Sequence, residues 1–168
     1  MRPLATLATL TLLAACGSAD AASNGSEPEA VLAAAGADQT LPTLVVYKTS
    51  TCGCCSGWVD HMRAAGFTVD ARDVPTNADL MRVKVDAGVP GAMATCHTAL
   101  IDGYVVEGHV PADQVERLLA DRPAVAGIAV PAMPVGSPGM EGPGAQPYRV
   151  YSWDRQGGSA VFAEVDPR

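Results

Sequence analysis

Three cysteines occupy four consecutive positions of this chain, in Cys52-Gly53-Cys54-Cys55, directly after an apolar run. Cys52 and Cys55 form a Cys-x-x-Cys pair, and Cys54 lies inside it. Three kinds of chemistry fit such a group: a redox-active dithiol, a site for soft metal ions, and a structural disulfide. The elements around the cluster and the remaining donors decide among them.

The predicted elements place the cluster where a thiol ionises easily. Residues 43–48, TLVVYK, form a β-branched run typical of a buried strand, and residues 56–66, SGWVDHMRAAG, predict a helix that ends at Gly66. A thiol between them faces the positive end of the helix dipole and unpaired N–H groups, which lower its pKa. We expect Cys52 to be the more exposed sulfur and Cys55 to lie one turn in, as in thioredoxin-like redox sites.

Cys54 favours metal binding over disulfide exchange alone. A third thiol lets exchange scramble among three sulfurs, whereas soft thiolates select Cu(I), zinc or iron–sulfur clusters. Three sulfurs on one tight loop cannot surround a single ion, so we expect them to bridge several ions. A disulfide-stapled module stays open as an alternative. At most one sulfur of the cluster can pair with Cys96, so a second bridge would have to lie within the cluster.

The fourth sulfur, Cys96, is predicted to face Cys52. The predicted elements over residues 41–122 follow the α/β order strand, helix, strand, helix, strand, strand, helix, which is the thioredoxin-like order. In such domains the loop before the third strand packs against the Cys-x-x-Cys loop and carries a cis-proline. The corresponding position here is Thr95, so the proline is missing. Its absence argues against ordinary exchange with peptide substrates.

Histidines and methionines are candidates to close the site. His97 and His109 have a plain structural alternative, as a satisfied core histidine and a capping histidine respectively. Met133 and Met140 would otherwise be gap-filling or exposed loop residues. Thioethers nevertheless bind Cu(I), and an exported chain that combines cysteine, histidine and methionine favours copper over zinc.

The N-terminal residues predict export and anchoring. Residues 1–15 combine Arg2 with an apolar run that is shorter than the roughly 20 residues that cross a bilayer. They end in Leu-Ala-Ala before Cys16, which resembles a bacterial lipobox, so we interpret them as a lipoprotein signal peptide with lipidation at Cys16. Ordinary cleavage that leaves Cys16 as a free thiol is the alternative. Residues 16–40 are small, polar and acidic, and predict a flexible tether.

Charge and the C-terminal residues complete the organisation. The net charge of −7 disfavours nucleic acid as a partner, because an acidic chain repels phosphates. Residues 123–147 are rich in proline, glycine and alanine and predict an irregular stretch. Two alternating runs, YRVYSW and SAVFAEV, follow it and predict a terminal β-hairpin. We therefore expect residues 123–168 to form a C-terminal extension that contributes to the metal site.

Three stretches together resemble one family. YKTSTCGCCSGWVDHMRAAGF, CHTALIDGYVVEGHVPADQVERLL and AVPAMPVGSPGME are similar to the exported CopG-like copper-resistance family, formerly known only as a domain of unknown function, over about residues 43–165. The resemblance implies a thioredoxin-like domain, a C-terminal extension that completes a copper site, a cysteine-bridged copper centre and Cu(I)/Cu(II) redox handling. It gives as sulfur ligands Cys52, Cys54, Cys55 and Cys96, with His97, His109 and the methionines of the extension as further ligands.

These observations lead to one expectation and two rivals. We expect a monomeric copper-binding protein of the periplasm, anchored by lipid to the outer or inner membrane, with Cys52 and Cys55 as its redox pair. Its partners would be copper ions and copper efflux or chaperone proteins, and copper oxidoreduction is the candidate activity. The rivals are a thiol–disulfide oxidoreductase of exported proteins and a copper chaperone without redox chemistry.

Overall fold

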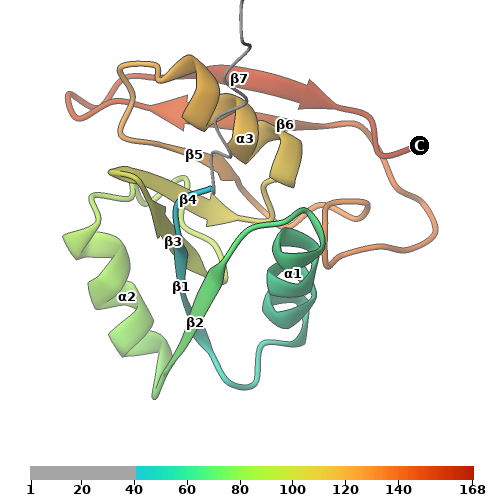
Figure 1. Ribbon diagram of the computed structural model, residues 1–168, viewed down its shortest axis with the longest axis horizontal. Helices are drawn as coiled ribbons and strands as arrows, with labels where there is room; N and C mark the ends of the chain where they lie inside the picture. The colour runs from blue at the N-terminus through green and yellow to red at the C-terminus, as the bar shows by residue number, and fades with distance from the viewer. Residues whose placement is uncertain (1–40) are drawn as a thin grey trace, which may run out of the picture. The chain divides into compact units, whose positions relative to one another are not determined.

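The computed structural model describes residues 41–168. Over these residues the chain folds as mixed α/β, with three helices and one seven-stranded sheet (Figure 1). The predicted α/β class is therefore confirmed. The predicted signal peptide 1–15, the tether 16–40 and the lipidation site Cys16 lie outside the described residues. Among the helices described, none combines the length and the apolar character needed to cross a membrane.

The elements in chain order are β1 Leu44–Thr49, α1 Gly53–Ala64, β2 Val69–Val74, α2 Asn77–Asp86, β3 Thr98–Ile101, β4 Tyr104–Gly108, α3 Ala112–Asp121, β5 Gly127–Val130, β6 Tyr148–Trp153 and β7 Ser159–Val165. In the sheet the strands lie in the order β2-β1-β3-β4-β5-β6-β7. Strand β1 runs parallel to β2 and antiparallel to β3, and β4 runs antiparallel to β3 and parallel to β5. The last two strands form an antiparallel hairpin joined to β5. Strands and helices thus alternate from β1 to β3, β4 follows β3 directly, and α3 is followed by three consecutive strands.

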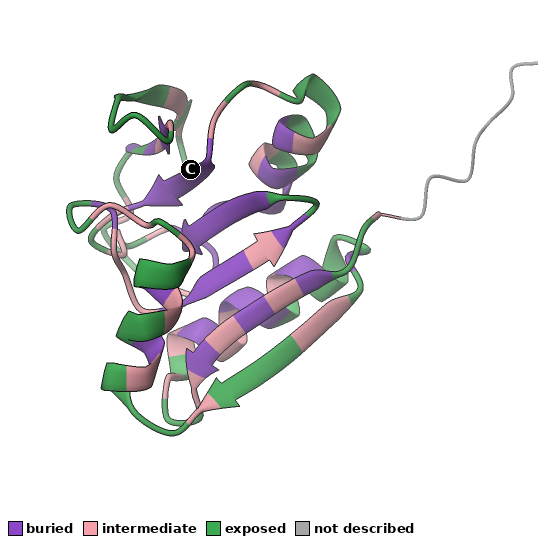
Figure 2. Ribbon diagram, turned by 90° about the vertical axis from the view of Figure 1, so that its left-hand side faces the viewer, coloured by how far each residue is buried: buried purple, intermediate pink, exposed green. Residues whose placement is uncertain are grey.

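Two faces of the sheet are covered by different elements. Val106 of β4 packs in one cluster with Trp58 of α1 and Val115 of α3, whereas its neighbour Val105 packs in a second cluster with Trp153. Adjacent strand residues point to opposite faces, so these clusters lie on the two sides of the sheet. Figure 2 shows α2 in front of the strands and α1 behind them. Helices α1 and α3 therefore share the face that carries the larger core.

The sequence predicted that the first helix begins at residue 56, but helix α1 begins at Gly53. Cys52 has an extended backbone and precedes the helix, and its carbonyl accepts the first helical hydrogen bond from Ser56 N at 3.2 Å. Cys54 and Cys55 were expected in a loop, and they lie instead in the first helical turn. The correction matters for the site, because a helical turn fixes the directions of both side chains.

Residues 123–147 are not wholly irregular, because they contain strand β5. This strand pairs with β4 on one side and with β6 on the other, so the C-terminal residues continue the same sheet. Its sequence, GIAV, gives a weak strand signal because it is short and begins with glycine. Gly127 is needed there, since a side chain would overlap the carbonyl of Val105 and the ring of Trp153.

Candidate metal centre

Four cysteine sulfurs lie together at one end of the sheet. The Sγ atoms of Cys52, Cys54, Cys55 and Cys96 all lie within 4.8 Å of one another. Cys52 and Cys55 are joined by a disulfide, and Cys54 and Cys96 are free. The Sγ of Cys54 lies 3.6 Å from that of Cys52, and the Sγ of Cys55 lies 3.6 Å from the carbonyl oxygen of Cys96. Cys96 thus lies against the cysteines of α1, as the order of the elements predicted.

The start of α1 positions three of these sulfurs. A turn after β1, closed by a hydrogen bond of 3.1 Å from Cys52 N to Thr49 O, brings the chain into the helix. Cys55 is fully buried, whereas Cys52 and Cys54 are half-buried. The exposed side of the cluster therefore carries two sulfurs, and the unpaired N–H groups of the first turn favour negative charge on them.

Two histidines extend the cluster on the side of Cys96. The Sγ of Cys96 lies 3.1 Å from Nε2 of His109 and 3.4 Å from Nδ1 of His97. His109 Nδ1 lies 2.7 Å from the carbonyl oxygen of Pro138, which can only accept, so Nδ1 donates the hydrogen bond. In the neutral ring Nε2 then holds a lone pair directed at Cys96. This arrangement is typical of a histidine held ready to bind a metal.

His97 is fully buried and incompletely satisfied. The centre of its ring lies 4.4 Å from that of Trp58, with the two rings tilted by 39°, and 5.1 Å from that of His109, which it meets edge-on. Its Nε2 has no hydrogen-bond partner among the described residues. Burial lowers the pKa of His97 well below its ordinary value, so the ring is neutral and keeps a lone pair. His97 therefore does not fit the alternative of a core histidine with all its hydrogen bonds made.

The thiol of Cys96 is held in its protonated form. Burial, with a further contribution from the thiol of Cys54, raises the pKa of Cys96 to about 12. A bound cation reverses this preference, because a metal-coordinating thiol is deprotonated. Metal binding at Cys96 must therefore release a proton, so the affinity for the metal should fall as the pH falls.

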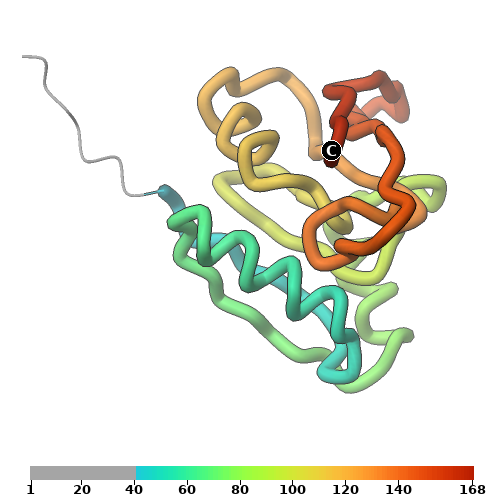
Figure 3. Tube along the Cα trace, turned by 90° about the vertical axis from the view of Figure 1, so that its right-hand side faces the viewer, coloured from blue at the N-terminus to red at the C-terminus, as the bar shows by residue number. Residues whose placement is uncertain are grey.

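The C-terminal residues pack directly on the cysteine turn. Figure 3 shows the segment after β5 passing beside the start of α1. At Gly139, where φ is +82°, a Cβ atom would lie 2.5 Å from the carbonyl oxygen of Cys54 and 2.7 Å from the amide nitrogen of Trp58. The neighbouring Pro138 supplies the acceptor for His109. The extension thus contributes to the environment of the cluster.

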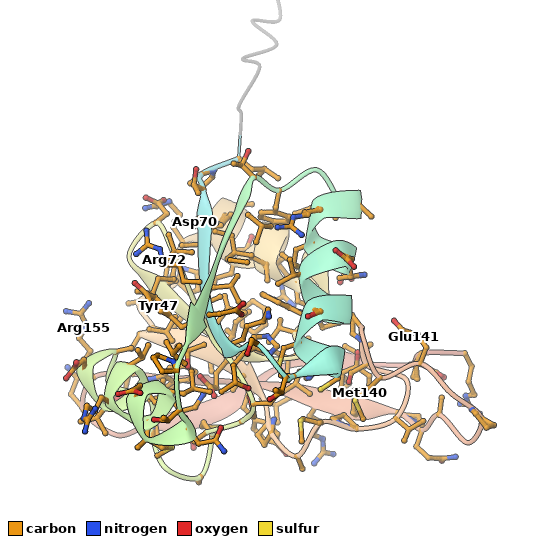
Figure 4. The ribbon with its side chains drawn as sticks, turned by 90° about the horizontal axis from the view of Figure 1, so that it is seen from below. Tyr47, Asp70, Arg72, Met140, Glu141 and Arg155 are labelled. Atoms are coloured by element: carbon orange, nitrogen blue, oxygen red, sulfur yellow. A yellow bond between two sulfur atoms is a disulfide. The ribbon has the colours of Figure 1, made fainter. Side chains whose placement is uncertain are left out.

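Met140 follows Gly139 and lies beside the start of α1 (Figure 4). Its backbone is fixed by hydrogen bonds with Ser137 at 2.8 Å and Gly136 at 2.9 Å. Met133 lies before this turn in a left-handed backbone conformation, with φ of 47°. Ligation by either thioether stays a prediction.

Sequence reasoning missed two buried charges behind Cys96. Lys84 on α2 and Glu107 on β4 form an ion pair of 2.6 Å and are almost completely buried. The signal was present for Glu107, which stands inside the apolar run YVVEG, where a solvated carboxylate is unexpected. The sequence did not indicate that Lys84 is buried, because a lysine on a helix usually lies in solvent.

Comparisons with known proteins agree with the donor set. The family described as "Protein of unknown function, DUF411" matches residues 93–140. A solved structure titled "Copper resistance protein copG- Form 1" is 43% identical, with a TM-score of 0.68, and the match covers 74% of this chain and 98% of that chain. A second, titled "Copper resistance protein copG- Form 2", is 44% identical with the same TM-score and coverage. Among curated proteins no match is found. The identity and coverage show that this chain belongs to the CopG-like copper-resistance family.

Proposed function

We propose that this chain binds copper in the service of copper resistance and interconverts Cu(I) and Cu(II) at its cysteine cluster. One observation carries the proposal: four cysteine sulfurs lie within 4.8 Å of one another, and one of them also meets two buried histidines. Thiolates are preferred ligands of Cu(I), and imidazole binds copper as well. The copper-resistance titles of the similar structures support the choice of copper.

Several copper ions fit this donor set better than one. Cys96 belongs both to the group of four sulfurs and to the group formed with His97 and His109. A thiolate shared in this way bridges ions that lie on its two sides. Cys54 extends the donor set at the exposed side, and the methionines of the extension are the proposed thioether donors. We therefore propose a multinuclear, cysteine-bridged centre.

The redox step exchanges two electrons between copper and the Cys-x-x-Cys pair. The thiolates of Cys52 and Cys55 each give one electron, two Cu(II) ions each accept one, and a sulfur–sulfur bond forms while two Cu(I) ions are produced. In the reverse direction the disulfide accepts two electrons from two Cu(I) ions and opens to two thiolates. The Cys52–Cys55 disulfide corresponds to the oxidised end of this cycle.

We further propose a thioredoxin-like domain over residues 41–122, followed by the metal-site extension 123–168. The order of elements from β1 to α3 and the parallel pairing of β1 with β2 support it. The sequence at residues 1–16 supports export to the periplasm and a lipid anchor in the outer or inner membrane. A monomer that exchanges copper with efflux or chaperone proteins completes the proposal.

Anaerobic titration of the reduced protein with Cu(I), against a Cu(I) chelator, tests copper binding. We expect tight binding of more than one ion per chain. Joint replacement Cys52→Ser, Cys54→Ser and Cys55→Ser should abolish it, whereas Cys16→Ser, which removes the remaining cysteine outside the cluster, should leave it unchanged. Unchanged binding in the triple variant would show that the cluster is not the copper site.

Mixing the reduced, metal-free protein with two equivalents of Cu(II) in the absence of oxygen tests the redox step. We expect the electron paramagnetic resonance signal of Cu(II) to disappear while one disulfide forms per chain. Persistence of the Cu(II) signal, with all thiols still free, would refute the redox step and support the alternative of a copper chaperone without redox chemistry.

A second candidate function is thiol–disulfide exchange with exported proteins. The disulfide at the junction between a strand and a helix favours it, because this placement is typical of thioredoxin-like oxidoreductases. Insulin reduction without metal, unaffected by Cys54→Ser, would support this candidate. We expect negligible insulin reduction.

A further inference from the structure

A buried ion pair lies directly behind the Cys96 segment. Lys84 Nζ donates to Glu107 Oε1 at 2.6 Å, and the two residues are only 2% and 0% exposed. Taking two charges out of water is costly, and apolar residues of similar size often give equal or greater stability. Stability alone therefore does not account for this pair.

The carboxylate of Glu107 holds both ends of a short segment. Its Oε1 accepts hydrogen bonds from Thr95 N at 2.6 Å and from Thr95 Oγ1 at 3.1 Å. Its Oε2 accepts from Thr98 Oγ1 at 2.7 Å, and the same hydroxyl accepts from Lys84 Nζ at 2.9 Å. Between these two anchored threonines lie Cys96 and His97.

The backbone of β4 closes the clamp. Gly108 N donates to His97 O at 3.2 Å, and at Gly108, where φ is +72°, a Cβ atom would lie 2.5 Å from Thr95 Oγ1. The side chain of Thr95 can therefore lie this close to β4 because residue 108 is a glycine. A proline in place of Thr95 could not make the contact with Glu107, since it has no N–H.

We propose that Glu107 is a positioning residue of the metal centre and that Lys84 holds its carboxylate in place. Through Thr95 and Thr98 the carboxylate fixes the segment that presents Cys96 and His97 to the cysteines of α1. The inference rests on the proposed copper-binding function and adds to it the residues that set the geometry of its distant ligands.

Two double variants separate positioning from charge. Lys84→Met with Glu107→Gln removes both charges but keeps a carbonyl oxygen that accepts from Thr95 N. Lys84→Met with Glu107→Leu also removes both charges and leaves Thr95 N without an acceptor. Neither variant leaves a buried unpaired charge, so both should fold. Thr95→Val with Thr98→Val, which keeps the ion pair and removes both hydroxyls, is a third variant in case the leucine variant does not fold.

Cu(I) affinity is measured for each reduced protein by competition with a Cu(I) chelator, and thermal unfolding is followed in parallel. The glutamine variant should bind within a few-fold of the wild type. The leucine variant should bind about 10- to 100-fold more weakly, the range found when outer hydrogen-bond partners of metal ligands are removed. The valine variant should fall between them. Repeated in a Cys96→Ser chain, the difference between the glutamine and leucine variants should become smaller, because the anchored segment then presents His97 alone.

Three outcomes would overturn the proposal. The first is a folded leucine variant that binds as tightly as the glutamine variant. The second is an equal difference between the two variants in the Cys96→Ser chain, which would indicate a general loss of structure. The third is wild-type affinity in the valine variant. A wild-type chain that fails to bind Cu(I) at all would instead refute the proposed function itself, which keeps the two failures distinguishable.

Discussion

Replacing Gly139 by alanine should separate the extension from the cysteine turn. A Cβ atom at this position would lie 2.5 Å from the carbonyl oxygen of Cys54 and 2.7 Å from the amide nitrogen of Trp58, so the segment must move away from α1. Gly144 provides a matched control in the same extension. Its φ is +85°, close to the +82° of Gly139, but an added Cβ would meet nothing within 4 Å.

The two variants share one cost and differ in another. A left-handed backbone at a residue with a Cβ costs roughly 1–2 kcal/mol, and alanine recovers about 0.4–1 kcal/mol by restricting the unfolded chain. Gly144→Ala should therefore lower the free energy of unfolding by about 0 to 1.6 kcal/mol. Gly139→Ala should lower the free energy of unfolding by a further 1–3 kcal/mol, approximately, because the added methyl group forces the segment away from α1.

Urea denaturation measures the stability difference, and Cu(I) titration of the same proteins measures its functional consequence. Displacement of the segment also moves Pro138, the acceptor for His109 Nδ1, so Gly139→Ala should weaken copper binding while Gly144→Ala should not. Equal unfolding free energies and equal copper affinities in the two variants would refute the idea that this contact couples the extension to the site.

Three further predictions concern the surroundings of the site. Trp58→Phe removes the indole donor that bonds Val110 O at 2.8 Å, leaves a buried carbonyl unpaired, and should cost about 1–3 kcal/mol in denaturant unfolding. Alkylation followed by peptide mass spectrometry of the oxidised protein should find two free thiols among the cysteines of residues 41–168, and four after reduction; four before reduction would contradict the disulfide. His61 Nε2 accepts from Ala112 N at 3.1 Å, and burial lowers the pKa of His61 below the unfolded value of about 6.5. The stabilisation is therefore fully present above about pH 6.5 and is lost as the pH falls from there through the lower folded-state pKa. His61→Ala should accordingly cost about 1 kcal/mol at pH 8 and less at pH 5, and an equal loss at both pH values would contradict this role.

Local patterns were sufficient to predict most elements. Thr76 caps α2 with a hydrogen bond of 3.1 Å from Asp79 N, and threonine is among the residue types preferred at this position. The turn at Asp102 and Gly103, both with positive φ, joins β3 to β4 as a hairpin, and such pairs are a strong sequence signal. These features depend on a few neighbouring residues, so a sequence displays them directly.

The features that escaped prediction depend on distant partners. Strand β5 forms because β4 and β6 supply hydrogen bonds on both sides, and the sequence of its own four residues does not predict a strand. Lys84 and Glu107 can be buried only because each neutralises the other across 23 residues of sequence. The approach of Cys96 to the cluster was predictable because the order of the elements fixes which loops meet, whereas the acceptor role of Pro138 was not.

The contact between the rings of Trp58 and His97 gives the protein an internal optical reporter. The chain has two tryptophans, and the second, Trp153, packs in the cluster on the other side of the sheet. A copper ion held by His97 would lie next to the Trp58 indole and quench its fluorescence, while Trp153 would keep emitting as a built-in reference. Occupancy of the centre could then be followed in the unlabelled protein, in real time and at micromolar concentration.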